Sequence, residues 1–321
     1  MAIHHLTLEE LCAADGSPSA VATGDVVLVD LDAGSGSPPS GVHGPGIVVG
    51  LTTDALDADH PAAAACDVVL PQEDPSVEQV LATVRRVPLA AWALVVHMRS
   101  APRATIDAGL EEESTVYSAL QAGPEFAAWL ATRPARSRAA EGPPVALERD
   151  GGSLQITLQR PNVRNALDPA MRDALVDAFS LPALDPSITE VHLRGEGPSF
   201  CAGGDLDTFG TFPDPETAHR IRLQQSVGRA ISLVGDRVTA HLHGACAGSG
   251  IELPAFAGRV IARADTRISL PELSLGLIPG AGGTESLPRR IGRHRTTRLA
   301  LTGEVLDATT ALQWGLVDAV T

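Results

Sequence analysis

Beyond residue 145 the chain alternates between strand patterns and helix patterns, and this alternation limits the folds open to it. Residues 168–179 place apolar side chains on one helical face, with Asp168 as a typical N-cap and Pro169 at the first helical position. Strand patterns flank this helix, two of them ending in glycine and the last containing a strand pair: 153–159, 190–195, 237–244 and 259–272. Strands that alternate with helices predict an α/β layered fold.

The part of the chain before residue 134 has its own strands and helices. A capping box formed by Thr7 and Glu10 predicts a short helix near the start. Three short apolar runs, at 25–31, 46–51 and 66–71, predict buried strands, and two helical stretches follow: 76–100, interrupted at Pro88, and 105–134, broken at Gly123-Pro124. Residues 134–145 have the composition of a linker. We therefore expect an N-terminal α/β region over 1–140 and a second region over 141–321.

Composition excludes several classes of partner and site. The net charge of −15 argues against nucleic acid, because phosphate backbones select basic surfaces. The four cysteines show no CxxC spacing and predict reduced thiols. The N-terminus has no apolar signal segment, and the chain has no apolar run long enough to span a membrane, so we expect a cytoplasmic location and no membrane partner. His241 and His243 have no evident third ligand, so no metal site is predicted.

A glycine-rich stretch at 276–284, "GLIPGAGGT", raises the question of a phosphate site. A P-loop requires a lysine after the second glycine, and the chain contains no lysine at all. A dinucleotide fingerprint requires a surrounding βαβ unit with a following acidic residue, and the pattern here does not fit one. These glycines therefore need an explanation other than a nucleotide.

Two glycine-bracketed turns follow predicted strands: "GEGPSFCAGGDL" at 195–206 and "HGACAGSGIEL" at 243–253. Such turns leave backbone N–H groups unpaired at a strand end or helix start, where they can hold an oxygen that gains negative charge. Glu252 lies on the first helical turn after the second of them, and Glu272 follows twenty residues later. Two glutamates beside two donor turns can provide acid and base for proton transfer next to a carbonyl. Cys201 and Cys246 are more consistent with small buried packing than with a nucleophile.

Four stretches in this order resemble the enoyl-CoA hydratase/isomerase (crotonase) superfamily: "RPNVRNALDPAM", "SFCAGGDL", the segment "HGACAGSGIELPAF" through "SLPELSLGLIPGAGGTESLPRRIG", and "LTGEVLDATTALQWGLVDAV". The resemblance covers 145–321, just over half of the chain. It implies a ββα spiral core of the crotonase type with a helical cap. It also implies that the glycine-rich stretch is a tight structural turn beside an acyl pocket, where glycine permits close packing.

Carried over by position, the resemblance assigns roles to individual residues. The backbone N–H groups of Gly204 and Ser249 form the oxyanion hole, although hydratases commonly have glycine at the second position. Glu252 and Glu272 are the catalytic pair, and which is the acid and which the base is left open. The CoA arm is expected along "PNVRNAL" and "AGGDL", with Arg164 rather than Arg160 as the candidate for its phosphates; the substrate-binding candidates are Arg164, Ala166, Ala202, Asp205, Leu206 and Gly280.

The chain departs from the family pattern at both ends. In family members this last motif is usually followed by helices that cover the acyl-CoA, whereas this sequence ends soon after "GLVDAV". Residues 76–133 resemble those missing helices, so we expect the N-terminal half to supply the cap, as in a circular permutation or a truncated tandem copy. On that interpretation the strands within 25–70 are a remnant of another crotonase half. The alternative is an unrelated small α/β domain.

The leading functional hypothesis is an enoyl-CoA hydratase, because relatives with other chemistry often lack one or both glutamates. Two alternatives remain open: another crotonase-type reaction (isomerase, dehydratase or thioester hydrolase), and a non-catalytic acyl-CoA-binding subunit. The resemblance implies an acyl-CoA substrate, no cofactor beyond the coenzyme A of that substrate, and a homo-trimer or hexamer.

Overall fold

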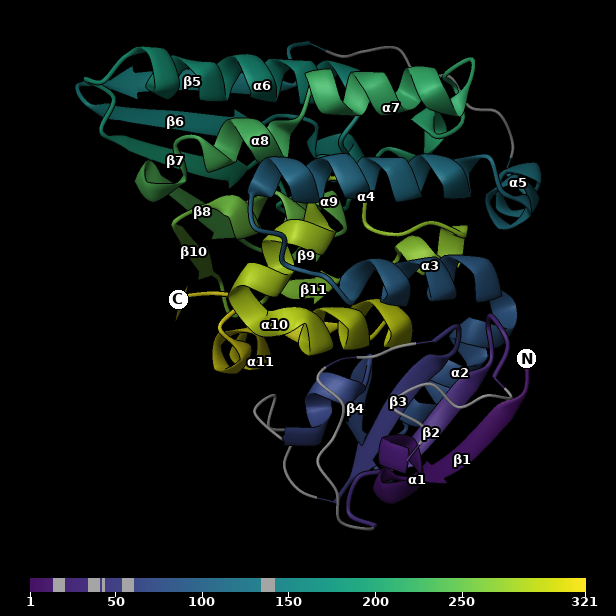
Figure 1. The fold of residues 1–321 in the computed structure, drawn as a ribbon. Coiled ribbons are helices and arrows are strands. Elements are labelled where there is room, and N and C mark those ends of the chain that lie inside the picture. Colours follow the sequence, from purple (N-terminus) through teal and green to yellow (C-terminus); the bar gives the residue numbers. More distant parts are fainter. Residues whose placement is uncertain (14–20, 34–40, 42–43, 54–60, 134–141) are drawn as a thin grey trace.

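The computed structural model describes residues 1–13, 21–33, 41, 44–53, 61–133 and 142–321. Two sheets lie at opposite ends of the molecule, and helices from both halves of the chain fill the space between them (Figure 1). The predicted α/β fold is confirmed. Most of the predicted linker lies outside the described residues, and the boundary near residue 140 stays a prediction.

The N-terminal sheet has four parallel strands in sequential order. The three predicted strands are confirmed, and one edge strand was not predicted: β1 (Ile3–Thr7), β2 (Val26–Asp30), β3 (Ile47–Thr52) and β4 (Val68–Pro71). The strands β2 to β4 are almost continuously buried, as expected for a parallel sheet covered on both faces. The predicted capping box is also confirmed, because Thr7 Oγ1 accepts from the Glu10 amide at 3.2 Å and Glu10 Oε2 accepts from the Thr7 amide at 2.8 Å; the helix is α1 (Leu8–Ala13).

The C-terminal region contains a six-stranded sheet in the order β13-β10-β8-β7-β6-β5. The hairpin β5–β6 is antiparallel and the other pairs are parallel; the strands are β5 (Val145–Asp150), β6 (Ser153–Leu158), β7 (Glu190–Gly195), β8 (Val238–Leu242), β10 (Arg259–Ala262) and β13 (Ala319–Val320). A second sheet contains β9 (Ala245–Ala247), β11 (Arg267–Ser269) and β12 (Leu306–Asp307). The two strands predicted within 259–272 are confirmed as β10 and β11, and they belong to different sheets.

Helices cover the sheets and carry the site. Asp168 accepts from the Met171 amide at 2.8 Å, which confirms the predicted N-cap of α6. The C-terminal helices are α6 (Pro169–Leu184), α7 (Pro215–Gln224), α8 (Val227–Ser232), α9 (Ser249–Glu252), α10 (Gly283–Thr302) and α11 (Ala308–Trp314), with short 3-10 turns that include η6 (Glu272–Leu275).

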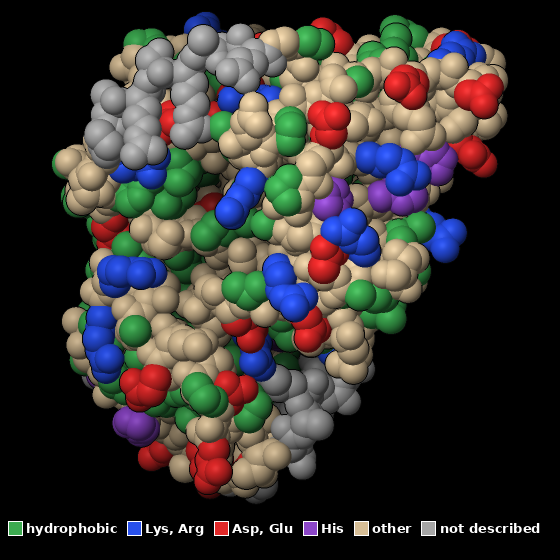
Figure 2. Space-filling model, turned by 180° about the vertical axis from the view of Figure 1, so that it is seen from behind, with side chains coloured by type: hydrophobic (Ala, Val, Ile, Leu, Met, Phe, Trp, Pro, Cys, Tyr) green, Lys and Arg blue, Asp and Glu red, His purple; other side chains and the backbone are tan. Residues whose placement is uncertain are grey.

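On the described part of one face, acidic and basic side chains are interspersed rather than gathered by sign (Figure 2).

Four helices follow the N-terminal sheet, and their predicted breaks at Pro88 and Gly123 are confirmed: α2 (Ser76–Arg86), α3 (Pro88–Met98), α4 (Ile106–Gln121) and α5 (Pro124–Ala131). Helix α4 packs against α7, α8 and α10, and α5 packs against η6 (Figure 1). The predicted helical cap from the N-terminal half is thus present. A single hydrophobic cluster runs from β2 and β3 through α3 and α4 into the C-terminal core. The evolutionary origin of this arrangement stays a prediction.

In the described part of the chain, no single helix has the length and apolar character to cross a membrane. The helices α2 and α3 meet that test only as a pair bent by 115°.

Candidate active site

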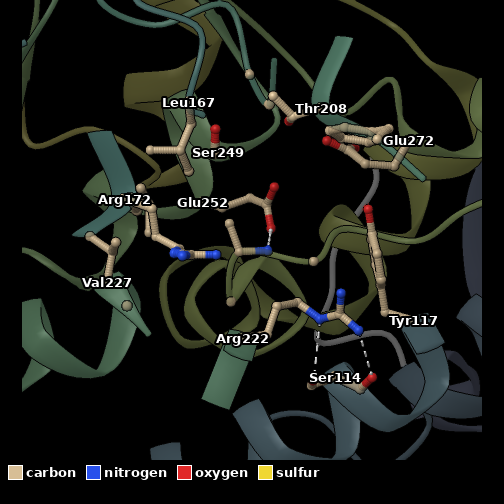
Figure 3. Close-up of a pocket in the computed structure, with 18 of the residues that line it drawn as sticks. Ser114, Tyr117, Leu167, Arg172, Thr208, Arg222, Val227, Ser249, Glu252 and Glu272 are labelled. Atoms are coloured by element: carbon tan, nitrogen blue, oxygen red, sulfur yellow. Dashed lines mark hydrogen bonds between the residues drawn. The ribbon is translucent and has the colours of Figure 1, made fainter. Parts of the chain in front are cut away.

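A cavity of about 350 Å³ lies between the two halves of the chain. Its walls come from α4 and α7 on one side and from the two predicted donor turns on the other (Figure 3). Of the residues predicted for the site, those that line this cavity are Ala202, Gly204, Leu206, Ser249, Glu252, Glu272 and Gly280. The structure therefore brings both donors and both glutamates of the sequence analysis to one place.

The first donor turn is anchored to the segment before α6. The Leu167 amide donates to Gly203 O and the Asp205 amide donates to Leu167 O, each at 2.8 Å. Between these anchors the Gly204 amide donates no hydrogen bond within the described part of the chain, so it remains available to a ligand oxygen. Gly203 has a φ of 101°, which favours glycine there.

The second donor turn packs directly on the first. A Cβ on Gly250 would lie 2.1 Å from Cys201 O, so only glycine allows α9 to approach this closely. Gly248 precedes α9 with a φ of 50°, and the following Ser249 amide also has no acceptor among the described residues. Burial raises the pKa of the Cys201 thiol, which matches the packing role expected for it.

The two predicted glutamates meet across Gly248. A Cβ on this glycine would lie 2.3 Å from Glu272 Oε1 and 3.6 Å from Glu252 Oε1. Glu252 is only 2% exposed, and its Oε2 accepts from the Ala281 and Gly283 amides at 2.8 and 2.9 Å. The Oε2 atom of Glu272 is buried and has no hydrogen-bond partner among the described residues.

A third buried carboxylate, Glu113 on α4, was missed by the sequence analysis. It accepts from the Gly282 amide at 2.7 Å, from the Thr284 amide at 2.9 Å and from Thr284 Oγ1 at 2.7 Å. Four consecutive amides, from 281 to 284, thus point alternately at Glu252 and at Glu113. The amides of the glycine-rich turn at the start of α10 do hold acceptor oxygens, but these oxygens belong to two carboxyl side chains of the protein. The acidic run that contains Glu113 was the only signal in the sequence.

Burial is the main cause that raises the pKa of each of the three carboxyl groups to about 8. The charge of Glu252 further raises the pKa of Glu113, that of Glu272 raises the pKa of Glu252, and that of Glu113 raises the pKa of Glu272. Backbone donors favour the ionised form of all three groups, and the donor to Glu272 is its own amide. Glu252 accepts from more backbone amides than Glu272, so of the two cavity carboxyl groups Glu272 holds a proton more readily.

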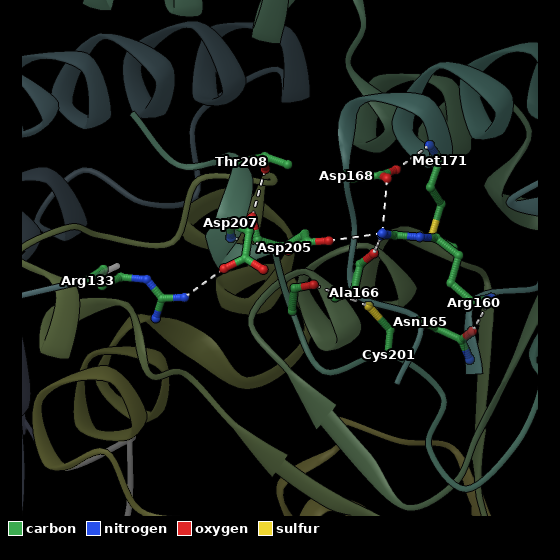
Figure 4. A network of polar contacts seen from close by, with 11 residues as sticks. Arg133, Arg160, Asn165, Ala166, Asp168, Met171, Cys201, Asp205, Asp207 and Thr208 are labelled. Carbon is green, nitrogen blue, oxygen red and sulfur yellow. Dashed lines mark hydrogen bonds and ion pairs between the residues drawn. The ribbon is translucent and has the colours of Figure 1, made fainter. Parts of the chain in front are cut away.

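The other predicted substrate contacts lie outside the cavity lining. Arg164 is exposed with a φ of 54°. Arg160 holds the remaining two, because its guanidinium donates to Ala166 O and pairs with Asp205 at 3.0 Å (Figure 4). It also pairs with Asp168 at 3.1 Å, and this network ties the first donor turn to the start of α6. The substrate-binding roles of Arg164, Ala166 and Asp205 stay predictions.

The fold and this cavity define a class of protein: a two-sheet α/β core with paired backbone donors and paired carboxylates facing one cavity. The family described as Enoyl-CoA hydratase/isomerase matches residues 148–321, more than half of the chain. The protein belongs to this family.

Known proteins support the same grouping. The chain is 35% identical over 167 residues to the 2,3-dehydroadipyl-CoA hydratase of Escherichia coli K12, covering 52% of this chain and 65% of that protein. It is 37% identical over 167 residues to the peroxisomal bifunctional enzyme of Danio rerio, covering 52% of this chain and 22% of that protein. The chain thus spans less than two thirds of either relative. An enoyl-CoA hydratase from Thermoplasma volcanium superimposes with a TM-score of 0.52 at 36% identity, covering 56% of this chain and 72% of that one.

Proposed function

We propose that the protein hydrates trans-2-enoyl-CoA thioesters. The observation that carries this proposal is a convergence on one cavity: two amides, at Gly204 and Ser249, that have no acceptor among the described residues, and two carboxyl groups, Glu252 and Glu272. Names of relatives support the reaction class, since the matched proteins include hydratases of this family. A Thermobifida fusca relative of these hydratases, 29% identical with a TM-score of 0.51, has been solved in complex with CoA, which supports an acyl-CoA substrate.

In the proposed reaction the two amides donate to the thioester oxygen. This oxygen becomes more negative as water attacks the β-carbon, so donors aimed at it stabilise the transition state more than the substrate. Loss of one such donor typically costs about 10²–10³ in rate. The donor turns cannot shift independently, because Gly250 packs against Cys201 O.

We also propose the proton-transfer roles that the sequence left open, and the hydrogen-bond pattern supports them. Glu252, held by two amides through Oε2, is the ionised base and takes a proton from water as the oxygen bonds to the β-carbon. Glu272, whose Oε2 has no donor in the described part of the chain, is the acid and delivers its proton to the α-carbon. Water is thereby added in full, and one proton passes from Glu252 back to Glu272 to complete the cycle.

The test is an ultraviolet assay of the conjugated thioester with short, medium and long acyl chains. We expect turnover by the wild type, and losses of about 10²–10⁴ for Glu252→Gln and for Glu272→Gln. Glu216→Gln, on the exposed face of α7, is the control and leaves the rate unchanged. Double-bond migration that survives Glu252→Gln identifies an isomerase. Binding of CoA esters without turnover of any chain identifies a non-catalytic subunit.

A further inference from the structure

One wall of a mainly apolar cavity carries several polar side chains. The wall is built from α4, α6, α7 and the start of α8, and apolar side chains such as Leu110 and Val227 are interleaved there with polar ones: Ser114, Gln121, Arg172, Arg222, Gln225 and Ser226. A methyl-ended chain lying against these groups would strip them of water without offering a hydrogen bond, which is unfavourable. The wall is better matched to a ligand group that is itself polar.

Arg222 on α7 is the centre of this wall. Its Nε donates to Ser114 Oγ at 3.1 Å and its Nη1 donates to Gln121 Oε1 at 3.1 Å. Its Nη2 donates to Ser114 O and to Ser118 Oγ, and its guanidinium stacks 4.5 Å from the centroid of the Tyr117 ring. All of these partners are electrically neutral. One N–H of Nη1 has no acceptor among the described residues, which leaves it free for a ligand.

The charge of Arg222 has no direct counter-ion in the described part of the chain. No carboxylate there lies within ion-pair distance of it, and its hydrogen bonds all go to neutral groups. Glu113 is near enough to act on it electrostatically, but the oxygens of Glu113 are occupied by the turn at 282–284. Burial lowers the pKa of Arg222, a sign that the half-buried cation is incompletely compensated.

A second cation lies on the same wall. Arg172 on α6 donates through Nε and Nη2 to Asp173 at 2.9 and 2.7 Å, and Asp173 is half exposed to solvent, so this pair is well screened. Figure 3 shows Arg172 and Arg222 on the side of Glu252 away from Leu167 and Ser249. A thioester held at the Ser249 amide therefore has both cations beyond its reacting carbons, where the far end of an acyl chain would lie.

We propose that this wall is a subsite for an anionic acyl terminus, so that the substrate is a short acyl-CoA whose chain ends in a carboxylate. The inference rests on the proposed function for the thioester end of the cavity. Arg222 donates the charge-assisted hydrogen bond, Arg172 adds to the positive field, and the neutral groups of α4 hold the Arg222 fork in place. The N-terminal half of the chain thereby contributes to substrate selection.

The test compares pairs of trans-2-enoyl-CoA thioesters of equal carbon number, one ending in a methyl group and the other in a carboxylate. We expect the wild type to favour the carboxylate ester at least about tenfold in kcat/KM, because a polar site rejects analogues that leave it unpaired. For the thioester whose chain ends in a carboxylate, Arg222→Gln should lower kcat/KM by about 10². For the thioester whose chain ends in a methyl group, the same variant should change kcat/KM by less than about threefold. Arg222→Lys should restore part of the loss.

Arg220→Gln is the matched control, because it removes the same charge from an exposed position on the same helix. It should leave both esters unchanged, and unfolding midpoints check that each variant remains folded. Equal losses on both esters with Arg222→Gln would overturn the proposal, since they mean that Arg222 binds the CoA phosphates or only docks α4. The absence of a carboxylate preference in the wild type would overturn it as well.

Failure of the proposed function is recognised separately. If neither ester is hydrated, calorimetry with the corresponding saturated thioesters measures the subsite by itself. Tighter binding of the carboxylate ester that is lost in Arg222→Gln would keep the subsite and reject the hydratase. Equal binding of both saturated esters would reject the subsite.

Discussion

The alternation of Glu113 and Glu252 along one turn predicts that a residue from the N-terminal half controls the protonation of the catalytic pair. The perturbation is Glu113→Gln. Glutamine keeps the shape of the side chain but replaces one carboxylate oxygen with an NH₂ group, so one of the three donors from Gly282 and Thr284 then faces another donor. A buried donor left unpaired costs about 1–3 kcal/mol, which is enough to displace the turn.

The ionised form of Glu113 places a negative charge beside the other two carboxyl groups, and the same change removes it. Two charges about 5 Å apart interact by about 3 kcal/mol at an effective dielectric of about 20, so losing even part of this repulsion lowers a neighbouring pKa by about one unit. Glu113 sits between several titratable groups: Glu252 and Glu272 in the cavity, Tyr117 on its own helix, Arg222 on α7, and His97 behind Thr284. Burial lowers the pKa of His97 to about 3, so it stays neutral in the working range.

The assay is the pH dependence of kcat for enoyl-CoA hydration. We expect Glu113→Gln to lower kcat about 10- to 100-fold, because small displacements of a catalytic group cost rates of this order. We also expect both limbs of the pH profile to move to lower pH by about one unit, since the pKa values of base and acid both fall. Glu111→Gln, exposed on the same helix, is the control. If kcat falls while the apparent pKa values of the profile stay the same, or if kcat is unchanged, Glu113 has only a structural role.

Three further predictions concern the same site and its cap. Burial raises the pKa of Glu272 to about 8 from its ordinary 4.5, so the folded state binds this proton more tightly than the unfolded state and the free energy of unfolding falls as pH rises between those values. Glu113 and Glu252 add to the same slope, so Glu272→Gln should make it shallower and should raise the free energy of unfolding above pH 8 by about 1 kcal/mol or more, measured by thermal scans across pH. A Cβ on Gly280 would lie 2.4 Å from the Tyr117 ring, so Gly280→Ala should lower kcat/KM at least about tenfold while the far-ultraviolet circular dichroism spectrum stays near native. An unchanged kcat/KM would show that the Tyr117 side chain can move aside without cost. Deletion of residues 1–140 should give insoluble or inactive protein, because one hydrophobic cluster continues from α3 and α4 into the C-terminal core. A soluble, active remainder would contradict the role of these helices as a cap. Light scattering of the full chain tests the expected trimer or hexamer.

Local patterns determined much of this protein from its sequence. The Thr7–Glu10 box, the Asp168 cap and the breaks at Pro88 and Gly123 depend on hydrogen bonds and backbone angles within a few residues, so they appear as predicted. The order of the motifs also placed Gly204, Ser249 and both glutamates at one cavity.

Contacts across the chain were decided only by the tertiary structure. The edge strand β1 was not predicted, because its short sequence with two histidines has a weak apolar pattern and its pairing with β2 is what stabilises it. Glu113 meets Gly282 across 169 residues, and Arg222 meets Ser114 across 108, so nothing in either local sequence signals the contact. Burial and the field of neighbouring charges set the protonation of Glu113, Glu252 and Glu272, and both exist only after α4 has docked on the turn that begins α10.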